Sequence, residues 1–285
     1  LGWVTAKGNR AVALGGIDTT SATGDNSFAT SGGVANGDNA SALNGSQAIG
    51  DNSFAATGGV ANGTSTIAIG STVTASSTAA TAIGSNGTKA TGYGATAIGR
   101  NAKVTAEKSV ALGFDLNVAH SGSTLVGYNS NVLANQATGI GSTINIDSTA
   151  QYATGIGYQV DVTGKNAIAM GSSDDSGTHT AAKAKDAIAI GTATVTTAEG
   201  ATAIGKKASA SQSDALAIGT TAAASESSAT AIGNGAAASK ANTIAVGTGA
   251  AASESSATAI GNGAVANKTN TVALGNATNA TGASA

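Results

Sequence analysis

The stretch SESSATAIGNGA occurs twice, at Ser225–Ala236 and at Ser253–Ala264. Three alanines precede each copy, so the identity between the two segments begins at Ala222 and Ala250. An active site needs one constellation of residues and gains nothing from a second copy. The duplication therefore indicates a repeated structural unit.

The phrase TAIG within this stretch recurs, with close variants, along most of the chain. We call the glycine that closes each phrase an anchor glycine. The anchor glycines are Gly70, Gly84, Gly99, Gly113, Gly127, Gly141, Gly157, Gly171, Gly191, Gly205, Gly219, Gly233, Gly247, Gly261 and Gly275. Eleven of the fourteen intervals between them have the same length, and the longer exceptions are Gly84–Gly99, Gly141–Gly157 and Gly171–Gly191. The sequence therefore predicts a solenoid with about 14 residues per turn.

The residues before each anchor glycine alternate large, small and large, which is the period of a β-strand. The residue directly before the glycine is always aliphatic or Met, and the small residue before it is nearly always Ala or Gly. We expect the large residues, and Thr where it stands three before the anchor, to form the buried face. A close neighbour must then pack against the small residues. The structural anchors chosen on this pattern are Gly84, Gly99, Gly113, Gly127, Gly205, Gly233, Gly261, Ile83, Ile98, Ile204, Ile232 and Ile260.

A second short strand is predicted after each anchor, because residues three and five past it are commonly apolar, as in Leu116 and Val118. The anchor then lies at a corner, where glycine supplies an unusual backbone conformation at little cost. One unit is strand, corner, strand, corner, and stacked units form a parallel β-solenoid. The sequence does not fit a coiled coil, because glycine and β-branched residues occupy the positions where the helical seam requires residues such as Leu. The shift between the two copies of the duplicated stretch corresponds to two turns.

The composition fits a thin structure rather than an ordinary globule. The chain has 285 residues with 41 Gly, no Pro, no Cys and 3% aromatic residues, and charged residues make up 10%, against about 25% in typical domains. The net charge is −2 and no basic block is present, so nucleic acid binding has no electrostatic support. No apolar run reaches the roughly 18 residues of a membrane-spanning helix.

These phrases resemble the head repeats of trimeric autotransporter adhesins of the YadA type. The family pattern, close to NSVAIGxxSxA, is similar to KSVALGFDLNVA at Lys108–Ala119, KNAIAMGS at Lys165–Ser172, DALAIGTTAAA at Asp214–Ala224 and TNTVALGNATNA at Thr269–Ala280. The resemblance implies an all-β fold, a left-handed parallel β-roll assembled as a homotrimeric head. A thin roll rich in Ala buries little surface alone, so association of three chains would supply the missing core.

The resemblance covers residues 64–285 as regular head repeats with an insertion at 172–186. Residues 1–63 are more degenerate repeats, in which GDNSFAxxGGVANG occurs at Gly24–Gly37 and Gly50–Gly63 with Phe28 and Phe54. We expect one continuous solenoid. The resemblance also implies a fragment of a larger exported protein, exposed on the bacterial outer membrane and anchored by a domain outside this sequence.

Scarce aromatic residues suggest one binding surface. Phe114, Tyr128 and Tyr158 each follow an anchor glycine directly, on three of four neighbouring turns. Stacked turns would align them in a ridge, and aromatic residues concentrate in binding hot spots. The alternative is a purely structural aromatic stack or packing between subunits.

The longest interval, from Gly171 to Gly191, suggests a second surface, a loop over Ser172–Asp186 that leaves the roll. Its charged residues and histidine are Asp174, Asp175, His179, Lys183 and Lys185. Loops on rigid scaffolds often carry recognition. The alternative is an insertion without a role.

Catalytic and cofactor motifs are absent from the sequence. The two histidines, His120 and His179, and the absence of Cys exclude a His/Cys zinc cluster. No GxSxG nucleophile motif occurs with a triad. We therefore predict no enzymatic activity, no cofactor and no metal site.

Three functions remain. The first is an adhesin head that binds a host cell-surface glycoprotein or an extracellular-matrix protein. The second is a passive spacer that projects a binding domain outside this sequence. The third is a solenoid that binds ice or another surface through a Thr array. We rank it lowest because the Thr residues alternate with Ile or Leu and are predicted to face inward.

Overall fold

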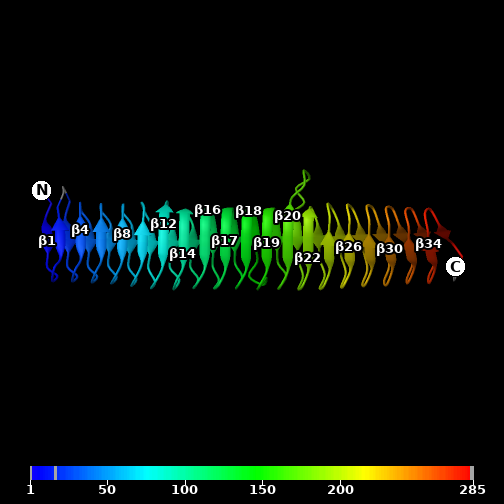
Figure 1. Ribbon diagram of the computed structural model, residues 1–285, viewed down its shortest axis with the longest axis horizontal. Coiled ribbons are helices and arrows are strands. Elements are labelled where there is room, and N and C mark those ends of the chain that lie inside the picture. The colour runs from blue at the N-terminus through cyan, green and yellow to red at the C-terminus, as the bar shows by residue number, and fades with distance from the viewer. Residues whose placement is uncertain (1, 16–17, 283–285) are drawn as a thin grey trace. The chain divides into compact units, whose positions relative to one another are not determined.

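The computed structural model describes residues 2–15 and 18–282, and it contains no helix among them. The chain divides into a first unit, Leu1–Gln136, and a second unit, Ala137–Ala285. Each unit is a parallel β-solenoid in which successive strands stack side by side, one turn after another (Figure 1). The predicted all-β solenoid is therefore confirmed for each unit.

The strands of the first unit are β1 (Val4–Ala6), β2 (Val12–Leu14), β3 (Thr20–Ala22), β4 (Phe28–Thr30), β5 (Val34–Ala35), β6 (Ser41–Leu43), β7 (Gln47–Ala48), β8 (Phe54–Ala56), β9 (Val60–Ala61), β10 (Ile67–Ile69), β11 (Thr74–Ala75), β12 (Thr81–Ser85), β13 (Lys89–Ala90), β14 (Thr96–Arg100), β15 (Lys103–Val104), β16 (Val110–Val118) and β17 (Thr124–Val132).

The strands of the second unit are β18 (Thr138–Ile146), β19 (Thr154–Val162), β20 (Ile168–Ser172), β21 (Thr180–Ala182), β22 (Ile188–Thr192), β23 (Val195–Thr196), β24 (Thr202–Ile204), β25 (Ser209–Ala210), β26 (Leu216–Ile218), β27 (Ala223–Ala224), β28 (Thr230–Ile232), β29 (Ala237–Ala238), β30 (Ile244–Val246), β31 (Ala251–Ala252), β32 (Thr258–Ile260), β33 (Val265–Ala266), β34 (Val272–Leu274) and β35 (Asn279–Ala280).

Two columns of strands run through each unit. The strands before the anchor glycines, here called A strands, pair with one another in parallel, as β26 pairs with β28 and β28 with β30. The strands after the anchors, here called B strands, pair in the same way, as β27 with β29. In β16, β17, β18 and β19 the A and B segments merge into one long strand.

The early turns of the first unit are shorter than the sequence pattern suggests. The A strands β4, β6, β8 and β10 align Phe28, Ser41, Phe54 and Ile67. Each of these steps along the chain is one residue shorter than the common interval between anchor glycines. From Phe28 to Ile67 the chain is therefore a regular array of slightly shorter turns, whereas the steps from Val4 to Thr20 and from Val12 to Phe28 are longer than the common interval. Phe28 and Phe54 are half-buried on the outer face of this array.

The prediction about which face of the A strand is buried was wrong. The small central residue, such as Ala97, Ala203 or Ala231, is completely buried. The large residues on either side face outward: Ile98 is 37% exposed and Ile204 is 36% exposed. Thr96 and Thr202 lie on the same outer face and are half-buried. The reason is that A and B strands of one flattened turn lie close together, so most turns have room only for Ala between them, and bulkier interior residues such as Leu125 are confined to a few turns.

The close neighbour expected against the small residues is the B strand of the same turn. Residues three and five past the anchor are buried there, as predicted for Leu116 and Val118. Where one strand places a bulky side chain in the narrow interior, the facing strand has a small residue. A Cβ added to Gly155 would lie 3.1 Å from Ile144 and 3.3 Å from Val162, so glycine accommodates the bulky interior residues of that segment.

Both corners of each turn use left-handed backbone. One left-handed residue lies two positions past the anchor, as Asn101 (φ 54°) and Lys207 (φ 57°), and another lies in the opposite corner, as Asp214 (φ 56°). The anchors themselves have φ between 120° and 158°. A Cβ on Gly99 would lie 1.8 Å from the carbonyl oxygen of Gly113 in the next turn. Glycine is needed there both for its backbone conformation and for close stacking.

Candidate functional site

The corner after the anchor glycine presents aromatic and cationic side chains in the first unit. Phe114 and Tyr128 are partners in the register of β16 and β17. Their ring centroids lie 5.2 Å apart with the planes inclined by 10°, so the rings are stacked. The guanidinium carbon of Arg100 lies 5.1 Å from the centroid of Phe114. These three residues, here called the corner stack, combine aromatic stacking with a cation–π contact.

Sequence reasoning predicted the stacking of Phe114 on Tyr128 but missed Arg100. A signal was available, because Arg100 follows Gly99 directly and so occupies the same position in its turn. Tyr128 is 53% exposed, so one end of the corner stack is open to a partner molecule. Tyr158 belongs to the second unit, where it is 51% exposed and aligns with Ser142 and Ser172.

Two further exposed tyrosines lie at the opposite corner, away from the anchor glycines. Tyr93 in the first unit is exposed, and Tyr152 in the second unit lies 5.9 Å from the ammonium of Lys165. Sequence reasoning did not single them out, since they fall outside the position that follows the anchor. They provide matched controls for the corner stack.

The predicted insertion projects from the second unit directly after β20 (Figure 1). It is shorter than expected, because Ser172 ends β20 and Thr180–Ala182 already form β21. The projecting segment is residues 173–179, here called the inserted loop. Lys183 and Lys185 were assigned to this loop, and that assignment was wrong: both follow β21, at the next corner.

Asp174 closes the inserted loop on itself. Its Oδ1 accepts hydrogen bonds from the backbone N–H of Ser176 at 3.1 Å, from the Ser176 hydroxyl at 2.6 Å and from the backbone N–H of Thr178 at 3.0 Å. Its Oδ2 lies 2.9 Å from Nζ of Lys207. The Ser176 hydroxyl and then the Lys207 ammonium hold the pKa of Asp174 well below its ordinary value.

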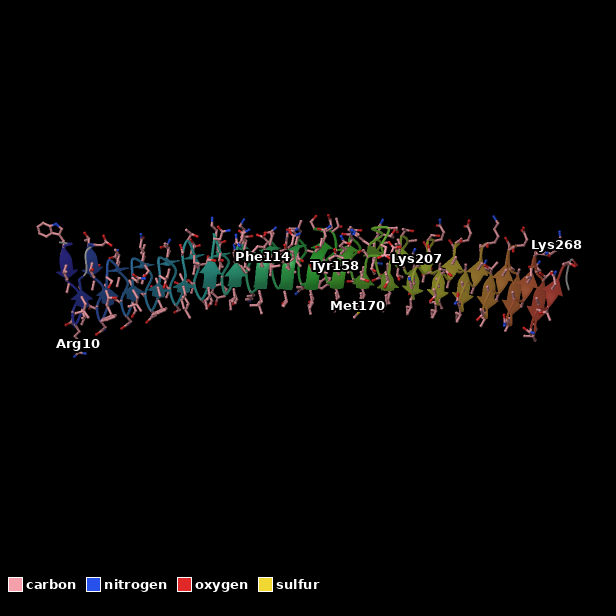
Figure 2. The ribbon with its side chains drawn as sticks, turned by 90° about the horizontal axis from the view of Figure 1, so that it is seen from above. Arg10, Phe114, Tyr158, Met170, Lys207 and Lys268 are labelled. Carbon is pink, nitrogen blue, oxygen red and sulfur yellow. The ribbon has the colours of Figure 1, made fainter. Side chains whose placement is uncertain are left out.

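Lys207 thus fastens the inserted loop to a later turn, and its own pKa is raised by the bond to Asp174. Asp174 retains only 7% side-chain exposure in this contact, whereas Lys207 is half exposed. In Figure 2 Lys207 lies toward the upper edge of the second unit, and Met170, on the outer face of its A strand, projects from the lower edge. The chain separation of Asp174 and Lys207 explains why sequence reasoning missed the pair.

The remaining charged candidates are partly engaged within the protein. Nδ1 of His179 lies 2.7 Å from Oδ2 of Asp161 in β19. Nζ of Lys185 lies 2.6 Å from Glu199 and 3.0 Å from Asp186, which together raise the pKa of Lys185 to about 12. Lys183 makes no ion pair within residues 2–15 and 18–282. Asp175 is exposed and lies close enough to Lys207 to support its raised pKa.

The described part of the chain offers no group of three or more His, Cys, Asp or Glu side chains suited to a metal ion. Within the same residues, no helix is long and apolar enough to cross a membrane.

The geometry defines a class of protein: a repeat solenoid with short parallel strands, turns of nearly constant length, a core of Ala and stacked anchor glycines. Comparison with known families agrees, since the YadA head domain repeat matches residues 90–115, 182–208, 210–236, 238–264 and 266–285. No curated protein matches the chain. In these five segments the chain is similar to the head repeats of YadA-type trimeric autotransporter adhesins.

The matched head repeats indicate an adhesin-type function. Heads of the family form homotrimers, are displayed on the bacterial surface and bind host surface molecules in general. This kind of fold and family is not enzymatic in character.

Proposed function

We propose that this chain is an adhesin head that assembles as a homotrimer on the bacterial outer membrane. It binds a host cell-surface glycoprotein or an extracellular-matrix protein. The observation that carries the binding proposal is the corner stack, in which Tyr128, Phe114 and Arg100 are held in a row on a rigid backbone.

The outward aliphatic residues of the A strands support the homotrimer. In the second unit Ile204, Ile218, Ile232, Val246 and Ile260 follow one another in register. They are half-buried or exposed in the single chain, although contiguous apolar strips of this kind are normally covered. Packing of three such strips would bury them and provide the large core that each Ala-filled roll lacks.

Binding would use the corner side of the turns rather than the aliphatic strip. The corner stack and Tyr158 offer amphipathic rings of the kind that dominate interface hot spots. The inserted loop adds Asp175 and His179, and Lys183 and Lys185 add positive charge after β21. The ion pair between Asp174 and Lys207 orders the loop before a partner binds, so less conformational entropy is lost on binding.

The experiment measures binding of the purified chain to immobilised matrix proteins and to host membrane glycoproteins, with the mass checked by light scattering. A trimer that captures a specific protein supports the proposal. The variant Phe114→Ala with Tyr128→Ala should lose most of this binding, while the control Tyr93→Ala should retain it. Equal binding by all three proteins would remove the corner stack from the binding surface.

A spacer remains the second candidate, favoured by one observation. Residues 201–280 contain no aromatic residue, and their core is a continuous cluster of buried alanines. Such uniform turns suit a rod that separates two other parts. A trimer that captures no host protein would favour this role.

A further inference from the structure

A polar groove lies on the first unit beside the corner stack. Its volume is about 420 Å³, within the range of ligand sites. Two columns of side chains line it. The lining residues are Asn101, Asp115 and Asn129 at the corner, and Lys103, Asn117 and Asn131 on the B strands.

The two columns are held in register by the solenoid. Lys103 aligns with Asn117, and Asn117 aligns with Asn131. The corner residues each lie two positions past an anchor glycine, with φ of 54°, 51° and 47° for Asn101, Asp115 and Asn129. Leu116, which is buried, closes the groove from below. Neighbouring rungs are separated by the interstrand distance of about 4.8 Å.

One column of corner asparagines elsewhere in this unit is bonded within itself. Nδ2 of Asn26 donates to Oδ1 of Asn39 at 3.3 Å, and Nδ2 of Asn39 donates to Oδ1 of Asn52 at 3.2 Å. These amides therefore satisfy each other along the stack.

In the groove, Asn101 donates to the carboxylate of Asp115, but the side-chain amides of Asn117, Asn129 and Asn131 make no hydrogen bond to the described protein. A side-chain amide carries two donors and a carbonyl acceptor. Three such amides that face one groove without protein partners present a set of donors and acceptors to a ligand.

The chemistry of the lining selects the ligand class. Lys103 and Asp115 carry opposite charges, so neither an anion nor a cation is favoured as a whole. Leu116 is the one apolar lining residue, so an apolar ligand gains little. A hydroxyl group both donates and accepts, which matches amides that do the same. We propose that this groove binds a neutral saccharide chain.

The corner stack adds an apolar contact for the same ligand. Phe114 and Tyr128 directly precede Asp115 and Asn129, so each ring is one residue along the chain from a corner residue of the groove. The C–H groups of a sugar ring can pack against exposed aromatic surface, where the π-electron density is negative. Because the backbone of three turns fixes all these groups, little ordering is required on binding.

This site goes beyond the adhesion proposed above, because its ligand is a saccharide and its polar contacts come from groove residues outside the corner stack. It shares only Phe114 and Tyr128 with the adhesin proposal. The groove lies on the B strands and their corner, whereas the aliphatic strip lies on the outer face of the A strands.

The experiment applies the whole chain to an array of neutral and acidic oligosaccharides, and then measures the affinity for the best neutral one by calorimetry. The test variant is Asn117→Ala with Asn131→Ala. The control is Asn279→Ala, since Asn279 occupies the same exposed position in β35 but lies outside the groove. Thermal unfolding of each protein verifies that the solenoid is intact.

The expected result is binding of a neutral oligosaccharide that the double variant weakens at least tenfold and the control leaves unchanged. Three results would overturn the inference: no neutral oligosaccharide bound, a preference for acidic ones, or equal affinity of the double variant. If the double variant unfolds, nuclear magnetic resonance of the unmodified chain tests whether the saccharide binds in the groove. The side-chain amide signals of Asn117 and Asn131 must shift on addition of the sugar, and unmoved signals reject the site.

Failure of this site is distinguishable from failure of the adhesin proposal. The array reports on the groove, whereas capture of host proteins by the chain reports on adhesion. Capture that survives Asn117→Ala with Asn131→Ala while no sugar binds would leave adhesion standing and reject the saccharide site.

Discussion

Replacement of one anchor glycine tests the stacking principle of the solenoid. Gly233 has φ 136°, and a Cβ there would lie 2.4 Å from the carbonyl oxygen of Gly247 and 2.6 Å from its carbonyl carbon. Real Cβ atoms essentially never come closer than 3.0 Å to such atoms, so the backbone of the next turn must move away. That movement pulls against the hydrogen bond from Gly247 N–H to Ile232 O, which is 2.8 Å long.

The cost of Gly233→Ala follows from these contacts. An unfavourable backbone conformation costs about 1–3 kcal/mol, and loss of one hydrogen bond between turns costs about 1 kcal/mol. We therefore expect a loss of about 2–4 kcal/mol in the free energy of unfolding. In a repeat protein each turn contacts only its neighbours, so this loss of stability is confined to the interface between two adjacent turns.

Gly235 is the matched control, two positions farther along in the same corner. It has φ 65°, and a Cβ there would meet nothing within 4 Å. Thr221 and Lys207 occupy the equivalent position with φ of 54° and 57°, so side chains are tolerated there. Gly235→Ala should cost less than about 1 kcal/mol, because reduced freedom of the unfolded chain offsets part of the backbone strain.

The assay is unfolding in guanidinium followed by circular dichroism, together with amide hydrogen exchange. Gly233→Ala should lower the unfolding midpoint clearly and speed exchange at the amide of Gly247, while Gly235→Ala should resemble the unmodified chain. If both variants have the same midpoint and the same exchange pattern, the proposed role of the anchor glycines is refuted.

Three further predictions concern assembly, binding and pH. Ile232→Asp should convert the trimer to monomers, because burial of an unpaired carboxylate in an apolar interface is costly; light scattering that still shows a trimer of unchanged melting temperature would contradict the proposed interface. Phe114→Ala with Tyr128→Ala should weaken host-protein binding about tenfold or more without lowering the melting temperature, and unchanged affinity would contradict it. The depressed pKa of Asp174 means that its stabilisation of the inserted loop is present above its ordinary pKa near 3.8 and is lost as the pH falls below that value. The protection of the loop amides from exchange, relative to an unstructured peptide at the same pH, should therefore fall in acid, and Lys207→Ala should lower it by a few fold at neutral pH. Protection that is independent of both changes would show that this ion pair does not hold the loop.

The predicted burial was inverted for a physical reason. Alternation along TAIG shows that large and small side chains point to opposite faces, but it does not show which face is inside. An ordinary sheet buries its larger residues, so Ile204 was predicted inside. The flattened turn leaves room only for Ala203, and Ile204 is displaced to the outer face. With this correction Thr202 also lies outward, which removes one of the two reasons for ranking a surface-binding Thr array low. The other reason stands, because apolar residues such as Leu216 still interrupt that array.

The candidate site was predictable only where it follows the repeat. Position after the anchor predicts that Phe114 and Tyr128 are neighbours, because residues one turn apart must stack. The pairing of Asp174 with Lys207 and of His179 with Asp161 depends on where the inserted loop folds back, and no periodic signal encodes that path. The free amides of Asn117 and Asn131 differ from the bonded amides of Asn26 and Asn39 only through local geometry.

The sequence by itself determined the length of the turn, the position of the corners and the parallel stacking, because regularly spaced anchor glycines between short alternating segments leave few other folds. Tertiary structure decided which face of the strand is the core, how far the inserted loop extends and which polar groups remain unpaired. These properties depend on distances across the turn and between turns, and such distances are set only when the two strands of each turn pack against each other.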